Sequence, residues 1–228
     1  ELFKRLDERL VKLDTLIGKL PKDKVKPFED ARSATLMFMV MASDDPALLM
    51  ASESRAARKL AEGLEPGSPK LDELEELARQ WAESGNSFVV FTEFVHMVEA
   101  IEQRLSRIRF TPDGAEEPVQ LKVWTITGST PNKERDRIKQ AFQDEPYPAC
   151  LVLNRAGQEG LNLQRASIVC LFDLPWNPTD VQQRLGRIRR LSSEHDTVRL
   201  YILITRNSID EAILGIHQRR RENIQAVS

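Results

Sequence analysis

The residues with the clearest potential for chemistry are the arginines of the segment DVQQRLGRIRRLSS, which begins at Asp180. On a helix, Gln183, Arg187 and Arg190 recur at i, i+4 and i+7 and share one face, whereas Arg184 points elsewhere. A guanidinium is permanently charged and forks onto phosphate oxygens, so two arginines on one face are suited to grip a phosphate chain. The alternative is that they only favour the negative end of a helix and the solvent.

Two glycine-containing segments each follow an apolar run that is typical of a buried strand. The segment NRAGQEGLNLQ carries Gly157 and Gly160, and the segment TITGST carries Thr127, Gly128 and a serine. Glycines permit close approach of a phosphate or ribose, while hydroxyls and a backbone N–H can bind a phosphate oxygen. Either segment taken alone is explained equally well by a plain turn.

An aromatic residue stands between two prolines in the segment FDLPWNPTD. The prolines predict a rigid turn that places Trp176 at the mouth of the sheet. Packing is the alternative role for this side chain. Asn177 is expected to cap the helix that follows, with Pro178 at its first position.

Five short β-rich runs alternate with helical stretches from Pro69 onward, which predicts an α/β fold with a parallel sheet flanked by helices. Two of the runs are continuously apolar, as expected when both faces of a strand are buried. Helices are expected between the strands, and a capping box at Ser208 opens the last one. The expected strands are Ser87–Thr92, Leu121–Thr127, Ala149–Leu153, Ser167–Asp173 and Val198–Ile204.

The N-terminal part has a different hydrophobic pattern and is expected to form a helical segment of its own. Apolar residues recur at helical spacing across residues 1–62, in three helices of which the last runs from Pro46 to about Glu62. The stretch Gly63–Ser68 is a natural boundary. We therefore expect a helical lead-in at 1–67 and an α/β domain at 68–228. Because the chain starts at Glu1 without Met and leads directly into a helix, we also expect it to be a piece of a longer protein.

The composition excludes some functions and leaves others open. The formal net charge is -2 and the pI is about 6.1, so bulk charge gives no support for nucleic-acid binding. Cys150 and Cys170 lie in apolar runs and are expected to be free core thiols in a reducing compartment. The three histidines have no metal-ligand spacing, so no metal site is expected. No apolar run is long enough to span a membrane.

The order of these segments resembles motifs IV, V and VI of the SWI/SNF-type ATPases of helicase superfamily two. The resemblance covers about Ser68–Leu214 and rests on VVFTEF, TGSTPNKERDRIKQAF, AGQEGLNLQRASIVCLFDLPWNP and QRLGRIRR, which occur in that succession. It implies a RecA-like fold, namely the second lobe of a motor that tracks along double-stranded DNA. Within this family, the combination of DLPWNP and QRxGR resembles sequences of the distant bacterial branch that includes the RNA-polymerase-associated ATPase.

The resemblance implies roles at the nucleotide. Arg187 and Arg190 would reach the γ-phosphate of an ATP bound, with Mg²⁺, mainly by the first lobe, and Gln183 would support that contact. Gly160 and Asn162 would line the nucleotide cleft. An arginine of this kind stabilises charge in the transition state of phosphoryl transfer.

The resemblance also implies contacts with double-stranded DNA that position the duplex without reading its sequence. The residues implied to approach the phosphates of one strand, or to border the same groove, are Thr92, Thr127, Gly128, Arg155, Trp176 and Asn177. The chain departs from the family pattern at Asn154, Gln158, Arg189 and Ser192-Ser193, and the two motif VI arginines are retained.

A complete motor also needs a GxxxxGK[ST] loop and an acidic pair for Mg²⁺. The only Gly-Lys pair, Gly18-Lys19, lies in a helical stretch without that loop. We therefore expect this chain to need the N-terminal RecA-like lobe of the same protein, and to be inactive without it, at a cytoplasmic, bacterial-type and nucleoid-associated location. Two alternatives stay open: a non-catalytic nucleic-acid-binding module on the same fold, and the lobe of a strand-separating DNA or RNA helicase.

Overall fold

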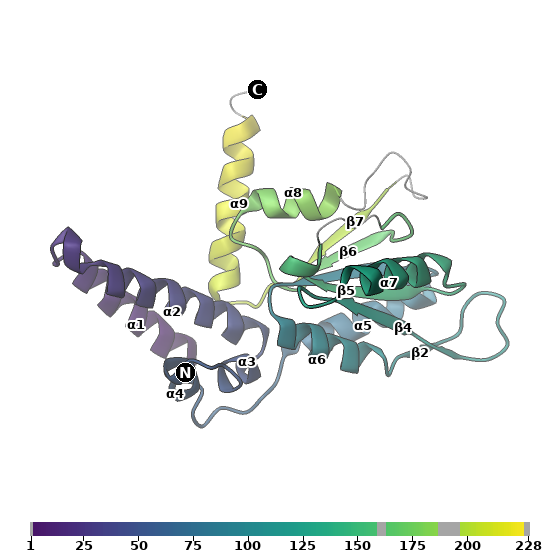
Figure 1. Ribbon diagram of the computed structural model, residues 1–228, viewed down its shortest axis with the longest axis horizontal. Coiled ribbons are helices and arrows are strands. Elements are labelled where there is room, and N and C mark those ends of the chain that lie inside the picture. Colours follow the sequence, from purple (N-terminus) through teal and green to yellow (C-terminus); the bar gives the residue numbers. More distant parts are fainter. Residues whose placement is uncertain (1, 159–162, 187–196, 226–228) are drawn as a thin grey trace. The chain divides into compact units, whose positions relative to one another are not determined.

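A computed structural model describes residues 2–158, 163–186 and 197–225 of the chain (Figure 1). The chain forms two compact units, of which the first comprises Glu1–Pro69 with Thr205–Ala212 and the second comprises Lys70–Ile204 with Ile213–Ser228. Among the described residues, every helix is too short or too polar to serve as a membrane span.

The first unit is helical. It contains α1 (Leu2–Ile17), a 3-10 turn (Lys22–Lys24), α2 (Lys26–Asp44), α3 (Pro46–Met50) and α4 (Arg55–Leu60). Leu6, Leu13 and Phe38 lie among its buried apolar residues. At the α1–α2 contact, the Nε of Arg9 donates to Oγ1 of Thr35 at 3.0 Å. The third predicted helix is in fact two, because Ser54 starts a new helix by accepting a hydrogen bond from the Ala57 N–H.

The segment Thr205–Ala212 contains the start of α9 (Ile209–Gln225). The Oγ of Ser208 accepts from the Asp210 N–H at 3.1 Å, so the helix begins where the predicted capping box places it. Thr205 contributes to this unit by donating from Oγ1 to the Ser43 carbonyl at 2.8 Å. The return of the chain to this helical unit is not visible in the amino-acid pattern.

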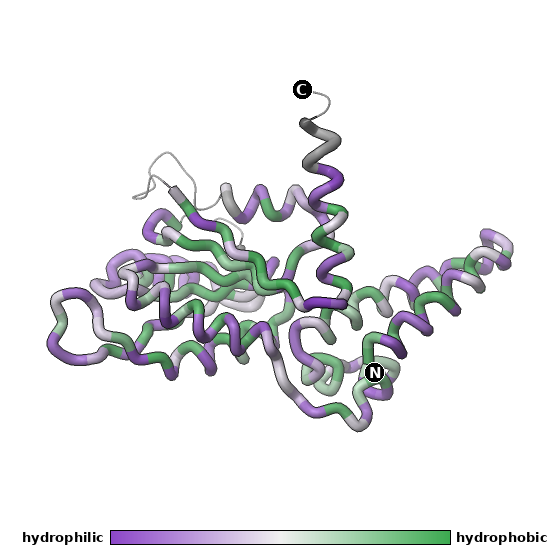
Figure 2. Tube along the Cα trace, turned by 180° about the vertical axis from the view of Figure 1, so that it is seen from behind, coloured by the Kyte–Doolittle hydropathy of each residue, from purple (hydrophilic) through white to green (hydrophobic). Residues whose placement is uncertain are grey.

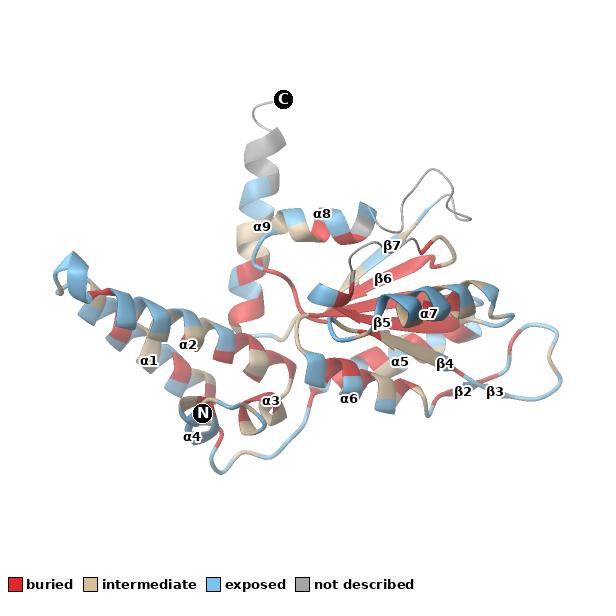
Figure 3. Ribbon diagram, viewed as in Figure 1, coloured by how far each residue is buried: buried red, intermediate tan, exposed pale blue. Residues whose placement is uncertain are grey.

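The second unit contains a five-stranded, fully parallel sheet in the order β4-β5-β1-β6-β7. This confirms the predicted α/β fold with a parallel sheet flanked by helices. The central strands β1, β5 and β6 are buried on both faces, whereas the edge strand β7 is half-exposed (Figure 3). Figure 2 shows that the strands of the sheet are largely hydrophobic. The strands are β1 (Phe88–Thr92), β4 (Lys122–Ile126), β5 (Ala149–Asn154), β6 (Ile168–Leu171) and β7 (Arg199–Ile202).

Helices cover both faces of this sheet. Trp81 of α5 (Pro69–Glu83) packs on Phe88, with ring centroids 5.0 Å apart. Phe142 of α7 (Asn132–Asp144) packs on Trp124 at 6.1 Å. Trp124 is in register with Leu151, and Leu151 is in register with Val89, the residue after Phe88 on β1. Because successive side chains of a strand point to opposite faces, Trp124 and Phe88 lie on opposite faces of the sheet, and so do α7 and α5. The other elements are α6 (Val95–Leu105), α8 (Pro178–Gly186), the 3-10 turn η2 (Arg155–Gln158) and the short antiparallel pair β2 (Arg109–Phe110) and β3 (Val119–Gln120).

Cys150 and Cys170 are buried free thiols in the sheet, as expected from the sequence. Burial raises the pKa of both thiols well above the ordinary value for cysteine. They therefore act as small apolar side chains of the core.

Candidate nucleic-acid and nucleotide site

Apart from Gln183, which lies on α8 (Pro178–Gly186), the predicted site residues that the structure describes lie where strands of the parallel sheet end. Thr92 is the last residue of β1, Thr127 follows β4 and Arg155 follows β5. Trp176 and Asn177 lie between β6 and α8. Since the carboxyl ends of parallel strands share one edge, segments far apart in the sequence meet there, at the edge where α/β sheets bind ligands.

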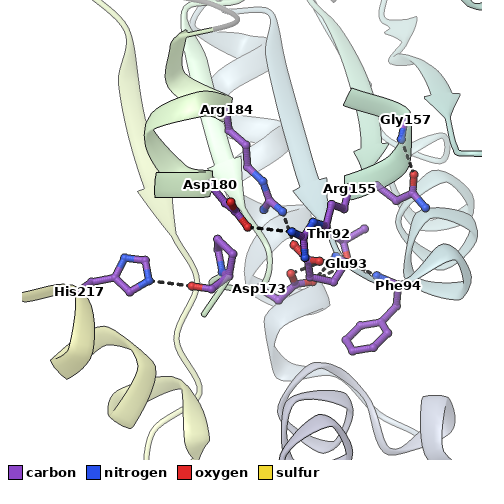
Figure 4. A network of polar contacts seen from close by, with 11 residues as sticks. Thr92, Glu93, Phe94, Arg155, Gly157, Asp173, Asp180, Arg184 and His217 are labelled. Atoms are coloured by element: carbon purple, nitrogen blue, oxygen red, sulfur yellow. Dashed lines mark hydrogen bonds and ion pairs between the residues drawn. The ribbon is translucent and has the colours of Figure 1, made fainter. Parts of the chain in front are cut away.

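A buried carboxylate joins the ends of β1 and β6. Asp173 accepts from Oγ1 of Thr92 at 2.6 Å and from the Glu93 N–H at 3.0 Å (Figure 4). Burial raises the pKa of Asp173 to about 6, and the charge of Glu93 adds to this, while the hydrogen bonds from Thr92 and the Glu93 N–H act in the opposite direction. The predicted contact between Thr92 and DNA stays a prediction, and it would require this hydroxyl to leave Asp173.

Helix α8 presents two different faces. Gln183 is exposed, whereas Arg184 is fully buried; the predicted role of Gln183 in supporting the phosphate contact stays a prediction. The Nη2 of Arg184 donates to Oε1 of Glu93, and its guanidinium carbon lies 5.4 Å from the centre of the Phe91 ring. The sequence pattern separated Arg184 from the predicted phosphate-binding face but gave it no function.

An arginine of α7 donates hydrogen bonds to the carbonyls of the TGST turn that follows β4. The Nε of Arg135 donates to the Thr130 carbonyl at 2.8 Å, and its Nη2 donates to the Thr127 carbonyl at 2.9 Å. The Thr127 and Ser129 hydroxyls lie 2.9 Å apart, and Gly128 and Ser129 are exposed. The N–H groups of Thr127 and Thr130 are bonded within the turn, to the Thr130 hydroxyl and the Thr127 carbonyl. The turn therefore offers the Ser129 hydroxyl and the N–H groups of the exposed Gly128 and Ser129, while its carbonyls face Arg135. Sequence reasoning missed Arg135.

The loop after β5 packs tightly against the end of β4. The Gly157 N–H donates to Oδ1 of Asn154 at 2.8 Å. A Cβ on Gly157 would lie 2.2 Å from the Ile126 carbonyl oxygen, and one on Gly128 would lie 2.8 Å from the Cβ of Ala156. Glycine is required at both positions because the two loops approach each other at backbone distance.

The side chain of Arg155 is largely exposed, and its Nη2 lies 3.4 Å from Oδ2 of Asp180, whose side chain is only 14% exposed. A long ion pair whose arginine lies in water contributes little to stability. The guanidinium is therefore free to exchange this carboxylate for a phosphate.

The loop before α8 combines an exposed aromatic ring with a helix cap. Trp176 is 40% exposed, so its ring is not a core side chain. Oδ1 of Asn177 accepts from the Thr179 N–H at 3.1 Å, which confirms the predicted cap of α8. Two residues of α9 contact the same loop: His217 donates from Nε2 to the Pro175 carbonyl at 2.7 Å, and Arg220 donates from Nη1 to Oδ1 of Asn177 at 3.3 Å.

Four predicted site residues, Gly160, Asn162, Arg187 and Arg190, lie outside the described residues. Their roles at the nucleotide stay predictions. In the parts of the chain that the structure describes, no group of three His, Cys, Asp or Glu side chains could hold a metal ion.

Comparison with known proteins places the chain in a family. Residues 69–192 match the helicase conserved C-terminal domain. The chain is 31% identical, over 75% of its own length, to the putative ATP-dependent helicase/translocase YwqA of Bacillus subtilis (strain 168), and it spans 17% of that protein. It is 32% identical, over 64% of its length, to the nuclear protein STH1/NPS1 of Saccharomyces cerevisiae (strain ATCC 204508 / S288c), of which it spans 10%.

Solved structures agree with this relationship. The Sulfolobus solfataricus SWI2/SNF2 ATPase core in complex with dsDNA superimposes with a TM-score of 0.68 at 25% identity, over 97% of this chain and 42% of that one. The match therefore covers less than half of each of these three proteins. The chain belongs to the helicase conserved C-terminal domain family, as a C-terminal RecA-like lobe of the SNF2 ATPase type.

Proposed function

We propose that this chain is the second lobe of an ATP-dependent motor that translocates along double-stranded DNA. The observation that carries the proposal is the gathering of phosphate-binding chemistry at one edge of the sheet. The exposed TGST turn, the exposed Arg155 and the exposed Trp176 come from three different strand ends of one compact unit. The SWI2/SNF2 ATPase core that resembles this chain was solved in complex with dsDNA.

In this proposal, the backbone and hydroxyl groups of Thr127 and Gly128 bind phosphates of one DNA strand, together with Arg155. Thr92 approaches the phosphates of the same strand, and Trp176 and Asn177 border the same groove. Contacts of this kind hold the duplex without reading its bases. An intracellular, nucleoid-associated location follows from such a substrate.

At the nucleotide, Arg187 and Arg190 stabilise the charge that develops on the phosphates, and Gln183 supports them from α8. Gly160 and Asn162 line the same cleft. We assign Mg²⁺ and most of the ATP contacts to a first lobe, because this sequence has no GxxxxGK[ST] loop to hold the phosphates. When bound, Mg²⁺ would supply positive charge that offsets the charge of the phosphates.

The test uses the full-length motor and the Arg190→Ala variant. We expect the DNA-stimulated rate of ATP hydrolysis to fall by about 10³-fold, because an arginine of this type is worth ~10³–10⁵ in rate. The isolated chain of 228 residues is expected to hydrolyse no ATP. DNA-stimulated turnover by the isolated chain would contradict the division of the site between two lobes.

The same experiment addresses the non-catalytic module. If Arg190→Ala leaves the DNA-dependent rate of hydrolysis unchanged, the chain binds nucleic acid on a helicase fold without taking part in catalysis. A strand-separating helicase is the remaining alternative. Displacement of a triplex-forming strand without unwinding of a forked duplex supports translocation, and the opposite result supports strand separation.

A further inference from the structure

The fully buried Arg184 stands out among the charged side chains of α8. Its Nη2 donates to Glu93, and its Nε and Nη1 have no hydrogen-bond partner in the described parts of the chain. Val181 precedes it by one helical turn and is also buried, so the two residues form the inward face of the described part of α8. A leucine or methionine at this position would bury the same face without removing a charge from water.

The partner of Arg184 is itself fixed at a second point. The Glu93 N–H is held by both oxygens of Asp173 at 3.0 Å, and Asp173 also accepts from Thr92 at 2.6 Å. Figure 4 shows Arg184 descending from α8 toward this cluster. The ends of β1 and β6 are therefore joined by Asp173. Helix α8 contacts the end of β1 through the Arg184–Glu93 pair and the Phe91 ring, and its Asp180 also pairs with Arg155 after β5.

A buried ion pair of this kind is a poor source of stability, because desolvation offsets much of the attraction. Its better-attested effect is to select one arrangement among several, since only one rotation of the helix brings the two charges together. In α8 that rotation leaves Gln183 exposed. The predicted motif VI arginines, Arg187 and Arg190, follow on the same segment of the sequence.

We infer that Arg184 is a positioning residue for ATP hydrolysis: through Glu93 it fixes the rotation of α8 against the end of β1, and thereby sets where the phosphate-contacting side chains of motif VI are presented. This inference rests on the proposed function. Arg184 itself touches neither nucleotide nor DNA, because its side chain is fully buried.

The main test compares the paired variant Arg184→Met/Glu93→Gln with wild type in the full-length motor. The pair removes both charges and keeps the aliphatic packing over Phe91, so neither charge is left buried alone. We expect kcat for DNA-stimulated ATP hydrolysis to fall about 10- to 100-fold, because a displacement of about 1 Å costs on that order in rate. KM for ATP, duplex affinity and the midpoint of thermal unfolding should stay close to wild type.

Two further variants complete the series. Arg184→Lys keeps the charge but loses the planar fork, so its kcat should lie between wild type and the pair. Gln182→Ala changes an exposed neighbour on the same helix and should leave every parameter unchanged. A loss of kcat that simply follows a loss of thermal stability across the series would assign Arg184 a structural role and overturn the inference.

A double-mutant cycle with Arg190→Ala separates this inference from the proposed function. If Arg184 acts through motif VI, adding the paired change to Arg190→Ala should cause little further loss of kcat. Losses that multiply independently would show that Arg184 acts by another route. If Arg190→Ala alone has no effect, the proposed function fails. If Arg190→Ala is impaired while the paired variant is fully active, only the positioning role fails.

Discussion

At the scale of single residues, the site depends on buried polar groups that a sequence pattern does not reveal. Arg184 is set apart on a helical wheel, but its burial depends on Glu93 and Phe91, which lie about ninety positions earlier in the chain. Asp173 sits in an apolar run and reads as part of a strand. Both are identified as site residues only when the strand order brings β1 and β6 side by side.

Asp173 gives the lobe a pH-dependent stability that can be measured. Its pKa rises from 3.8 to about 6 on folding, chiefly through burial. The folded state therefore holds the proton more tightly than the unfolded state, and the contribution of Asp173 is fully present below pH 4 and is lost as pH rises through 6. The shift corresponds to roughly 3 kcal/mol.

The matched variant is Asp173→Asn, which keeps an oxygen acceptor and cannot ionise. We expect the difference in unfolding free energy, wild type minus variant, to decrease between pH 4 and pH 7 by up to about 3 kcal/mol. Urea unfolding of both proteins at several pH values measures it. A difference that is constant, or that increases with pH, would show that Asp173 is not held in the predicted protonation state.

At the scale of elements, the sequence predicted the strands well and their order not at all. All five predicted strands exist, each within about three residues of its predicted ends. Alternation and apolar runs report local structure, whereas the order β4-β5-β1-β6-β7 depends on long-range packing. The same distinction between local and long-range structure applies to the TGST turn. The turn could be predicted from its own residues, whereas the contact with Arg135 of α7, which holds the turn, could not.

Arg135 is expected to determine how well this turn binds DNA. Its guanidinium donates to the carbonyls of Thr127, Gly128 and Thr130. The N–H groups of Gly128 and Ser129, on the other side of the first two peptides, therefore point away from Arg135. In Arg135→Ala the turn loses this order. We expect duplex affinity of the full-length motor to fall about five- to tenfold, roughly 1–1.4 kcal/mol, measured by fluorescence anisotropy.

Arg137→Ala provides a matched control on the same helix. Arg137 is exposed and pairs with Glu134, three residues earlier, at 2.7 Å. Its removal takes away one surface charge without touching the TGST turn, so duplex affinity should change less than in Arg135→Ala. Equal losses in the two variants would mean that positive charge on α7 matters and that the order of the turn does not.

At the scale of the whole molecule, a chain with a formal net charge of -2 cannot rely on general electrostatic attraction to DNA. Attraction has to come from local contacts, many of them with uncharged hydroxyl and N–H groups. Such contacts release few counterions from the duplex, so binding should weaken less with added salt than in a strongly basic DNA-binding protein.

Arg155 is the charged residue among the predicted DNA contacts, so its contribution can be measured from the salt dependence of DNA binding. Each phosphate neutralised by a cation contributes about -0.9 to the slope of log K against log salt concentration. We expect Arg155→Ala to make this slope shallower by about 0.9 for the full-length motor, by the same amount on duplexes of different sequence, because a phosphate contact carries no base specificity.

The control for this measurement is Arg107→Ala. Arg107 is also exposed, but it follows the C-terminal end of α6, a helix that starts beside the carboxyl end of β1 and runs away from it toward the start of β4. It carries the same charge as Arg155 and lies away from the edge where the predicted contacts gather. A slope that changes equally in both variants would mean that total charge governs binding, and would remove the reason for placing the duplex along the carboxyl edge of the sheet.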